Sequence, residues 1–187
     1  WTGVISTTEQ LLAKRTEAIE KFQDKLVIGD AYRQGLGDVE KAITAYKEAL
    51  EYGAFSKGPL LSLVQIHLDQ GQDEEALTYL QQLADAEDTI EKKSKWLMSM
   101  ASVVQDSMKD LARAATLYEQ ILDQDVSKLE AFEALVGILS KADDISSLED
   151  AYRRMIQRLQ SQDGAAPDKK VLFMLYRNLG EIYHQEM

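Results

Sequence analysis

The chain contains no cysteine among its 187 residues. Disulfide bonds, thiolate metal sites and cysteine nucleophiles are therefore excluded. Only two prolines and ten glycines are present, which argues against an all-β fold rich in turns and favours long helices. No apolar run approaches the ~20 residues that span a bilayer, and no charged segment leads into an apolar one as in a signal peptide. We therefore expect no membrane partner and a cytoplasmic location. The lack of an initiating methionine predicts a segment of a longer protein.

Basic residues are also few. Twenty-one Lys and Arg stand against 32 Asp and Glu, so the net charge is −11. Such a chain repels nucleic acid and anionic membranes at long range, so we expect no nucleic-acid partner. Hydrophobic residues make up 45% of the chain, enough for a core and too many for a disordered segment.

A helical pattern recurs along the chain: a small residue, a large one four positions later and an apolar one seven positions later. This spacing places all three on one face of a helix. The four copies are Ala42-Tyr46-Ala49, Ala76-Leu80-Leu83, Ala114-Tyr118-Ile121 and, more loosely, Leu148-Tyr152-Met155, at intervals of 34, 38 and 34 residues. A second helical segment precedes each copy, and the short turn between them forces antiparallel packing. Gly suits the end of the first helix, and Asp38, Asp73 and Asp110 suit the N-cap of the second.

The units are of two alternating kinds. The first, third and fifth have one extra residue before the interhelix Asp, which predicts a longer interhelix turn and a duplicated four-helix block. The sequence stops just before the interhelix turn of the fifth unit. It predicts either a further second helix beyond Met187 or a lone capping helix at the end.

The chain is predicted to form one domain, 1–187. Its units are about 22–54, 57–86, 89–125 and 127–161, with a half unit at 168–187. Before them, Ser6 to Glu9 reads as a capping box that opens a helical extension over 6–21 and runs into the first unit. Aromatic and methionine side chains at helical spacing are predicted to be core: Tyr46, Met98, Met100, Phe132, Tyr152, Phe173 and Tyr176.

These units resemble the tetratricopeptide repeat (TPR) family. The residues 176–183 match its first helix (helix A) best, and Ala42, Tyr46 and Ala49 match its second (helix B) best. The resemblance covers roughly residues 22–187, although Lys25 replaces the usual tryptophan and the proline after helix B is missing. It implies an all-α fold, a right-handed α-solenoid of antiparallel helix pairs.

No constellation of catalytic residues is visible. His67 and His184 are isolated, so His67 is predicted to be a core or groove residue and no metal or cofactor is expected. Nucleophile and zinc-hydrolase motifs do not occur, so we expect no enzyme. Residues 69–91 hold eight carboxylates and no Lys or Arg. They form either a solvated acidic edge or a docking surface for a basic partner.

The resemblance implies a scaffold that binds a protein or peptide segment in the concave groove lined by the A helices. The groove positions carried over are Asp30, Arg33, Gln65, Asp69, Gln105, Asp106, Glu133, Lys141, Arg177 and Glu181. The Lys and Asn clamp that some members use for a C-terminal carboxylate is missing, because Leu26, Asp30 and Ser62 occupy its places. A spacer or regulatory array within a larger protein is the alternative. A monomer or weak homodimer is expected.

Overall fold

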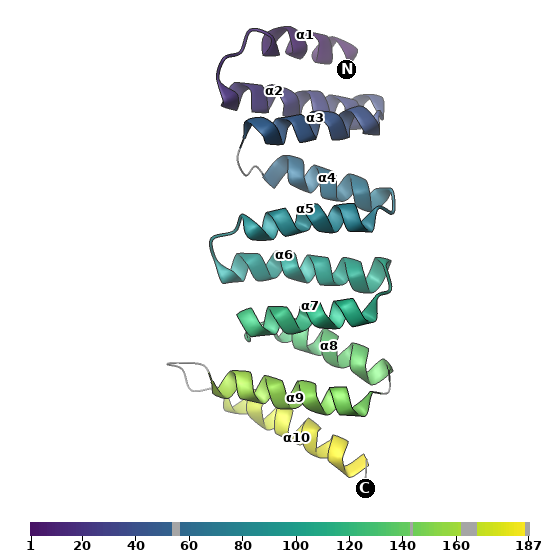
Figure 1. Ribbon diagram of the computed structural model, residues 1–187, viewed down its shortest axis with the longest axis vertical. Helices are drawn as coiled ribbons and strands as arrows, with labels where there is room; N and C mark the ends of the chain where they lie inside the picture. Colours follow the sequence, from purple (N-terminus) through teal and green to yellow (C-terminus); the bar gives the residue numbers. More distant parts are fainter. Residues whose placement is uncertain (54–56, 143, 162–167, 186–187) are drawn as a thin grey trace. The chain divides into compact units, whose positions relative to one another are not determined.

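The computed structural model describes residues 1–53, 57–142, 144–161 and 168–185, and these residues contain helices and no strand. The chain divides into two compact units, Trp1–Asp88 (unit 1) and Thr89–Met187 (unit 2). Within each unit, every helix packs against the next one along the chain and runs antiparallel to it (Figure 1). The prediction of an all-α solenoid of helix pairs is confirmed, and its right-handed sense stays a prediction.

The A helices of the first four repeats alternate with their B helices. Unit 1 consists of α1 (Thr2–Leu12), α2 (Ala18–Asp30) with its continuation η1 (Ala31–Leu36), α3 (Val39–Tyr52), α4 (Lys57–Asp69) and α5 (Asp73–Asp85). Unit 2 consists of α6 (Ile90–Ser102) with its continuation η2 (Val103–Ser107), α7 (Leu111–Gln124), α8 (Leu129–Lys141), α9 (Ile145–Gln160) and α10 (Lys169–Gln185).

The recurring sequence pattern is the buried stripe of the four B helices. Its small first residues Ala42, Ala76 and Ala114 are fully buried, and all the residues four and seven positions later are buried as well. Leu148 alone of the pattern is only half-buried. Burying this stripe removes apolar surface from water at each helix junction, which is the main stabilising term in a stack of short helices.

Tyr46 lies at the centre of the core of unit 1. It is fully buried in a cluster with Ala42, Ile43, Leu63 and Ile66, which come from α3 and α4. From the other side, α2 approaches α3 closely at Gly29, where an added Cβ would lie 2.6 Å from Cε1 of the Tyr46 ring. Glycine is therefore favoured at this position, because the tyrosine ring occupies the space of a side chain.

The extra residue of the first and third repeats lies in the last turn of helix A, which is π-helical in η1 and η2, and the end of the fifth lies outside the described residues. In α4, the amide of Gln72 donates to the carbonyl of His67, five residues back. In the first repeat, the amide of Asp38 donates to the carbonyl of Tyr32, six residues back, and Asp110 repeats this bond to Val104. The predicted longer turn is thus corrected: the helix widens, because the amide that opens helix B keeps a carbonyl of helix A as its partner.

Three carboxylates cap B helices. Asp38, Asp110 and Asp144 each accept a hydrogen bond from the amide three residues later, at 3.2, 3.0 and 3.0 Å. The N-cap predicted at Asp73 is wrong, because Gln72 is the N-cap and Asp73 is the first residue of α5. The repeat without an extra residue places the equivalent of Asp38 at position 72, one residue earlier than the sequence pattern indicated.

The capping box predicted at Ser6 is also wrong. Ser6 lies inside α1, whose N-cap is Trp1 without a side-chain bond. The helix ends at Leu12 and the chain reverses, so that α1 packs on α2 instead of running into it. This reversal buries Ile5 beside Ile28 and Ala31, a gain from tertiary packing that periodicity along one helix cannot reveal.

Candidate functional site

The A helices of unit 1 bring four predicted groove residues into one polar row. Arg33, at the end of the first A helix, lies 4.0 Å from Asp69 on α4 (Nη2 to Oδ2). The amide of Gln65, one turn before Asp69, donates to the same carboxylate at 2.7 Å. Asp30 lies one turn before Arg33 and is exposed. We call Asp30, Arg33, Gln65 and Asp69 the A-helix row.

A residue that the sequence assigned to the core also reaches this row. The Tyr46 hydroxyl donates a hydrogen bond of 2.6 Å to Oδ1 of Asp30, although its ring is fully buried. Burial, which is the larger cause, and the hydrogen bond to the Asp30 carboxylate raise the pKa of Tyr46 to about 12. The phenol is therefore neutral and fixes one oxygen of Asp30, while the side chain of Asp69 stays 62% exposed.

In unit 2, predicted groove residues form hydrogen bonds and an ion pair within a single repeat. The Gln105 amide donates to Asp106 at 3.4 Å, and the Tyr118 hydroxyl donates to Gln105 at 3.0 Å. Arg177 lies 3.4 Å from Glu181, one turn along α10. The remaining two residues, Glu133 and Lys141, lie at exposed positions near opposite ends of α8. These pairs stay within single repeats, unlike the link between Arg33 and Asp69.

Tyr118 repeats part of the arrangement at Tyr46. The two tyrosines are 72 residues apart and occupy the same position of their B helices. Burial raises the pKa of Tyr118, whose hydroxyl likewise points to polar residues at the end of its A helix. Sequence reasoning missed both hydroxyls, although their recurrence on the small-large-apolar pattern was a visible signal.

The prediction that Phe173 and Tyr176 belong to the core is wrong. They are 69% and 50% exposed on α10, whereas Leu175, Leu179 and Ile182 on the same helix are buried. The spacing correctly showed an apolar face, but no described helix covers it.

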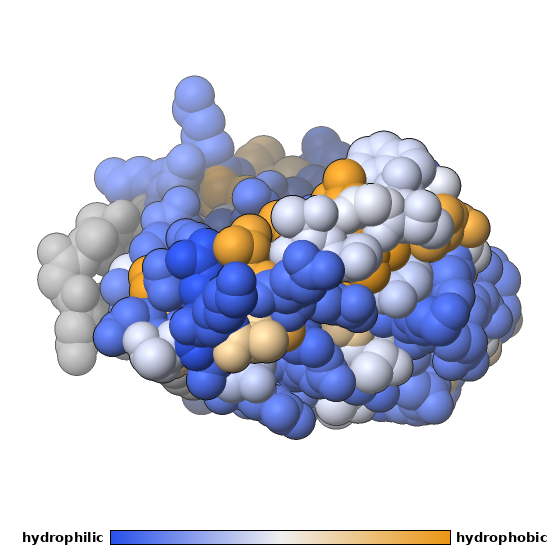
Figure 2. All heavy atoms as spheres, turned by 90° about the horizontal axis from the view of Figure 1, so that it is seen from above, coloured by the Kyte–Doolittle hydropathy of each residue, from blue (hydrophilic) through white to orange (hydrophobic). Residues whose placement is uncertain are grey.

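At the other end of the chain, Figure 2 looks onto α1 and shows hydrophobic side chains between hydrophilic ones at the surface. The exposed apolar residues there are Val4 and Leu11 of α1 and its N-cap residue Trp1.

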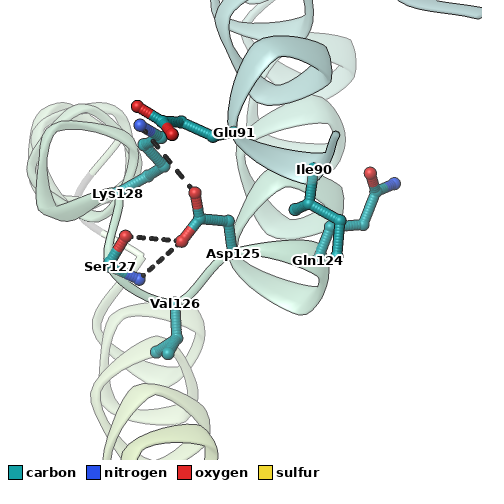
Figure 3. A pocket seen from close by; sticks show the side chains of 7 residues that line it. All are labelled: Ile90, Glu91, Gln124, Asp125, Val126, Ser127 and Lys128. Carbon is teal, nitrogen blue, oxygen red and sulfur yellow. Dashed lines mark hydrogen bonds and ion pairs between the residues drawn. The ribbon is translucent and has the colours of Figure 1, made fainter. Parts of the chain in front are cut away.

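A shallow pocket of about 420 Å³ lies in unit 2 where α6 begins and α7 ends. Figure 3 shows Asp125 between Ser127 and Lys128. One oxygen of Asp125 accepts from the amide and the hydroxyl of Ser127 at 3.1 and 2.5 Å, and Lys128 lies 3.8 Å from the other. These polar groups satisfy one another and tie the loop to the start of α8. Because small-molecule sites are mostly apolar and enclosed, we assign this pocket a structural role.

His67 is buried between α4 and α5, as predicted. Its ring stacks on Tyr79 with centroids 5.5 Å apart, and its Nδ1 lies 2.5 Å from Oε1 of Gln72.

Within the described ranges, no group of three or more His, Cys, Asp and Glu side chains could hold a metal ion. In the same ranges, every helix is too short or too polar to cross a bilayer. Parts of the acidic segment are paired in unit 1: Glu87 binds Lys57 at 2.6 Å, and Asp69 belongs to the A-helix row.

A model of the tetratricopeptide repeat matches residues 26–52, the segment that contains Gly29, the π turn, the Asp38 cap and the stripe from Ala42 to Ala49. Residues 26–52 are therefore a tetratricopeptide repeat (TPR). Helix pairs of the same kind follow along the chain, and repeats of this kind support a general role as a protein-interaction scaffold. No curated protein matches the chain.

Three solved structures are similar to this TPR protein. BtubC (BKLC) from P. vanneervenii is 16% identical with a TM-score of 0.45, and the match covers 98% of this chain and 80% of that one. PilF of Pseudomonas aeruginosa is 15% identical with a TM-score of 0.47, covering 99% and 85%. Naa15/Naa10 bound to HypK-THB is 17% identical with a TM-score of 0.33, covering 96% and 32%. All three scores are below 0.5, and the assignment rests on the matched repeat and the helix pairs.

Proposed function

We propose that this TPR protein binds an extended or helical segment of a partner protein across its A helices, with the A-helix row of unit 1 as the main contact. The observation that carries the proposal is the link between Arg33 and Asp69. It joins the A helices of two successive repeats and holds their polar side chains on one surface. A segment that crosses both helices would meet hydrogen-bond donors and acceptors that are already oriented, which lowers the entropy lost on binding.

The energetics of the row suit exchange with a ligand. At 4.0 Å, with Asp69 62% exposed, the ion pair with Arg33 is a surface pair worth about 0–1 kcal/mol. A partner can therefore replace it at small cost and gain bonds to the guanidinium, the carboxylate and the Gln65 amide. By contrast, Asp30 is held by Tyr46 and keeps its place when the others exchange.

The charge of unit 1 indicates which segment fits. Trp1–Asp88 contains 16 Asp and Glu against 8 Lys and Arg. Two of the four residues of the row are carboxylates, and only Arg33 is basic. Long-range attraction therefore favours a partner segment that is basic overall and carries one acidic group for Arg33.

The test is co-purification of partners with the tagged intact chain from a lysate of its source. The informative variant exchanges the pair, Arg33→Asp with Asp69→Arg. This exchange keeps the net charge and the local ion pair while reversing which helix carries which charge. The control is Lys47→Glu, at an exposed position of α3 away from the row. We expect partners to be lost with the exchanged pair and kept with the control.

Circular dichroism at 222 nm should be the same for all three proteins, because the changes are at the surface. Equal partner recovery by wild type and the exchanged pair would remove the A-helix row from binding. That result would favour the alternative of a spacer or regulatory array.

A further inference from the structure

Asp30 of the A-helix row is an exposed carboxylate that the protein holds by one oxygen. The hydroxyl of the fully buried Tyr46 donates to Oδ1 at 2.6 Å, which anchors the side chain from below. Among the described residues, no side chain pairs with the other oxygen of Asp30. Arg33 lies one turn away on the same helix, but its ion pair is with Asp69. The row therefore presents an oriented negative charge that these residues leave without a counter-charge.

Unit 2 contains the same arrangement without the charges. Three residues of the first repeat have counterparts 72 positions later: Asp30 corresponds to Ser102, Arg33 to Gln105 and Tyr46 to Tyr118. Tyr118 is buried as well, and its hydroxyl donates to the Gln105 side chain at 3.0 Å. Ser102 is exposed, as Asp30 is. A repeat of this kind thus packs, and its buried hydroxyl finds a partner, with no charge at either A-helix position. The charges of the first repeat are therefore available for a ligand rather than needed by the fold.

We propose that Asp30 binds a lysine or arginine side chain of the partner segment, beside the acidic side chain that Arg33 binds. This rests on the proposed function of the A-helix row and names the groups that the row recognises. A charged donor forms a shorter and stronger hydrogen bond with a carboxylate than a neutral donor does. Because Asp30 and Arg33 are three residues apart on a helix, their Cβ atoms are about 5–6 Å apart. The two charges of the partner match this distance when they are two residues apart in an extended segment, or three or four apart in a helix.

Tyr46 is a positioning residue for this contact. Its hydroxyl fixes the Asp30 side chain in the free protein, so less freedom is lost when the partner binds. Tyr46→Phe removes the hydroxyl and keeps the ring that packs against Gly29. We expect this variant to bind a basic side chain about two- to tenfold more weakly, the effect of immobilising one side chain on binding. A merely structural role of the hydroxyl would not discriminate between a partner with a basic side chain and one without it.

The probe is a random library of peptides of about twelve residues, which are about 40 Å long when extended. The intact chain selects peptides from this library, and anisotropy of the labelled synthetic peptides gives their Kd. The main variant is Asp30→Ser, which introduces the residue that unit 2 carries at this position and should therefore fold. Its matched control is Glu51→Ser, which removes one exposed carboxylate near the end of α3 instead. Each peptide is also made with its basic residue replaced by glutamine.

We expect the selected peptides to carry a basic and an acidic residue at one of the matching spacings. Asp30→Ser should weaken their binding by about tenfold, as should the glutamine replacement in the peptide. The two changes together should cost little more than either alone, which identifies a direct contact in a double-mutant cycle. Glu51→Ser should leave Kd within about twofold. Tyr46→Phe should weaken binding of the basic peptide and leave that of the glutamine peptide unchanged.

Two results would separate this inference from the proposed function. Peptides that lose affinity for the exchanged pair Arg33→Asp with Asp69→Arg, but not for Asp30→Ser, would overturn the role of Asp30 and leave the A-helix row as the binding surface. Peptides that bind all these variants equally, or a selection that yields no peptide, would contradict both. An equal loss on Asp30→Ser for the basic and the glutamine peptides would also overturn the inference, because the carboxylate would then not contact the cation.

Discussion

The substitution of glycine by alanine is expected to have opposite effects at two positions of this protein. At Gly29 the new Cβ would lie 2.6 Å from Cε1 and 2.8 Å from Cδ1 of Tyr46. Alanine gains about 0.5–1 kcal/mol over glycine inside a helix. Overpacking of a filled core costs about 1–3 kcal/mol, and the fully buried Tyr46 ring has little room to withdraw. The net result should be a loss of up to about 2.5 kcal/mol, with a central value of about 1 kcal/mol.

At Gly137 in α8 the same Cβ meets nothing within 4 Å, so only the helix-forming gain of about 0.5–1 kcal/mol remains. For units of this size, 1 kcal/mol corresponds to about 4–8 °C in Tm. Thermal and urea unfolding followed by circular dichroism at 222 nm should therefore show a lower Tm for Gly29→Ala and a higher one for Gly137→Ala. A Tm for Gly29→Ala at or above that of wild type would refute the close approach of α2 and α3.

Three further predictions concern polar groups. Replacing Arg158 by Met removes its ion pairs with Glu119 and Asp123 on α7 and should lower the free energy of unfolding by about 1–3 kcal/mol. The loss should be smaller in a protein that already carries Glu119→Gln. A double-mutant cycle in urea measures this difference. The raised pKa of Tyr46 means that folding favours the neutral phenol, so its contribution is complete below pH 10 and is lost as pH rises from about 10 to about 12. Across that pH range, the free energy of unfolding measured in urea should fall less steeply for Tyr46→Phe than for wild type. Equal slopes for the two proteins would contradict the raised pKa of Tyr46. Asp38→Ala should cost about 0.5–2 kcal/mol through loss of the helix cap, whereas Asp38→Ser should restore most of it in the same assay.

Much of the fold could be predicted because the repeated pattern is local. The small-large-apolar stripe fixes which face of each B helix is buried, and a short turn leaves only antiparallel packing for its A helix. Features that depend on tertiary packing could not be read from the chain. The reversal after Leu12 and the cap at Gln72 both depend on how one helix meets another.

The same distinction applies to the candidate site. The family resemblance named Arg33 and Asp69 as groove positions of neighbouring repeats, and in the structure these two side chains lie 4.0 Å apart. The sequence did not reveal that the Tyr46 hydroxyl bonds to Asp30. The repeated pattern identifies tyrosine as a large apolar residue by its ring, and it carries no information on the partner of the hydroxyl. Phe173 and Tyr176 were predicted to be core because an apolar face shows that a helix could be covered, and not that it is.

The π-helical turns give this repeat architecture a tolerance to changes in length. An added residue in helix A widens its last turn, and the amide at the start of helix B then bonds to a carbonyl six residues back instead of five. The starting point and the buried face of helix B stay the same, as the fully buried Ala42 and Ala76 of the two kinds of repeat show. Single-residue insertions and deletions can therefore accumulate at this joint during evolution without disturbing the core. The joint is also a place where the polar end of an A helix can change at little cost in stability.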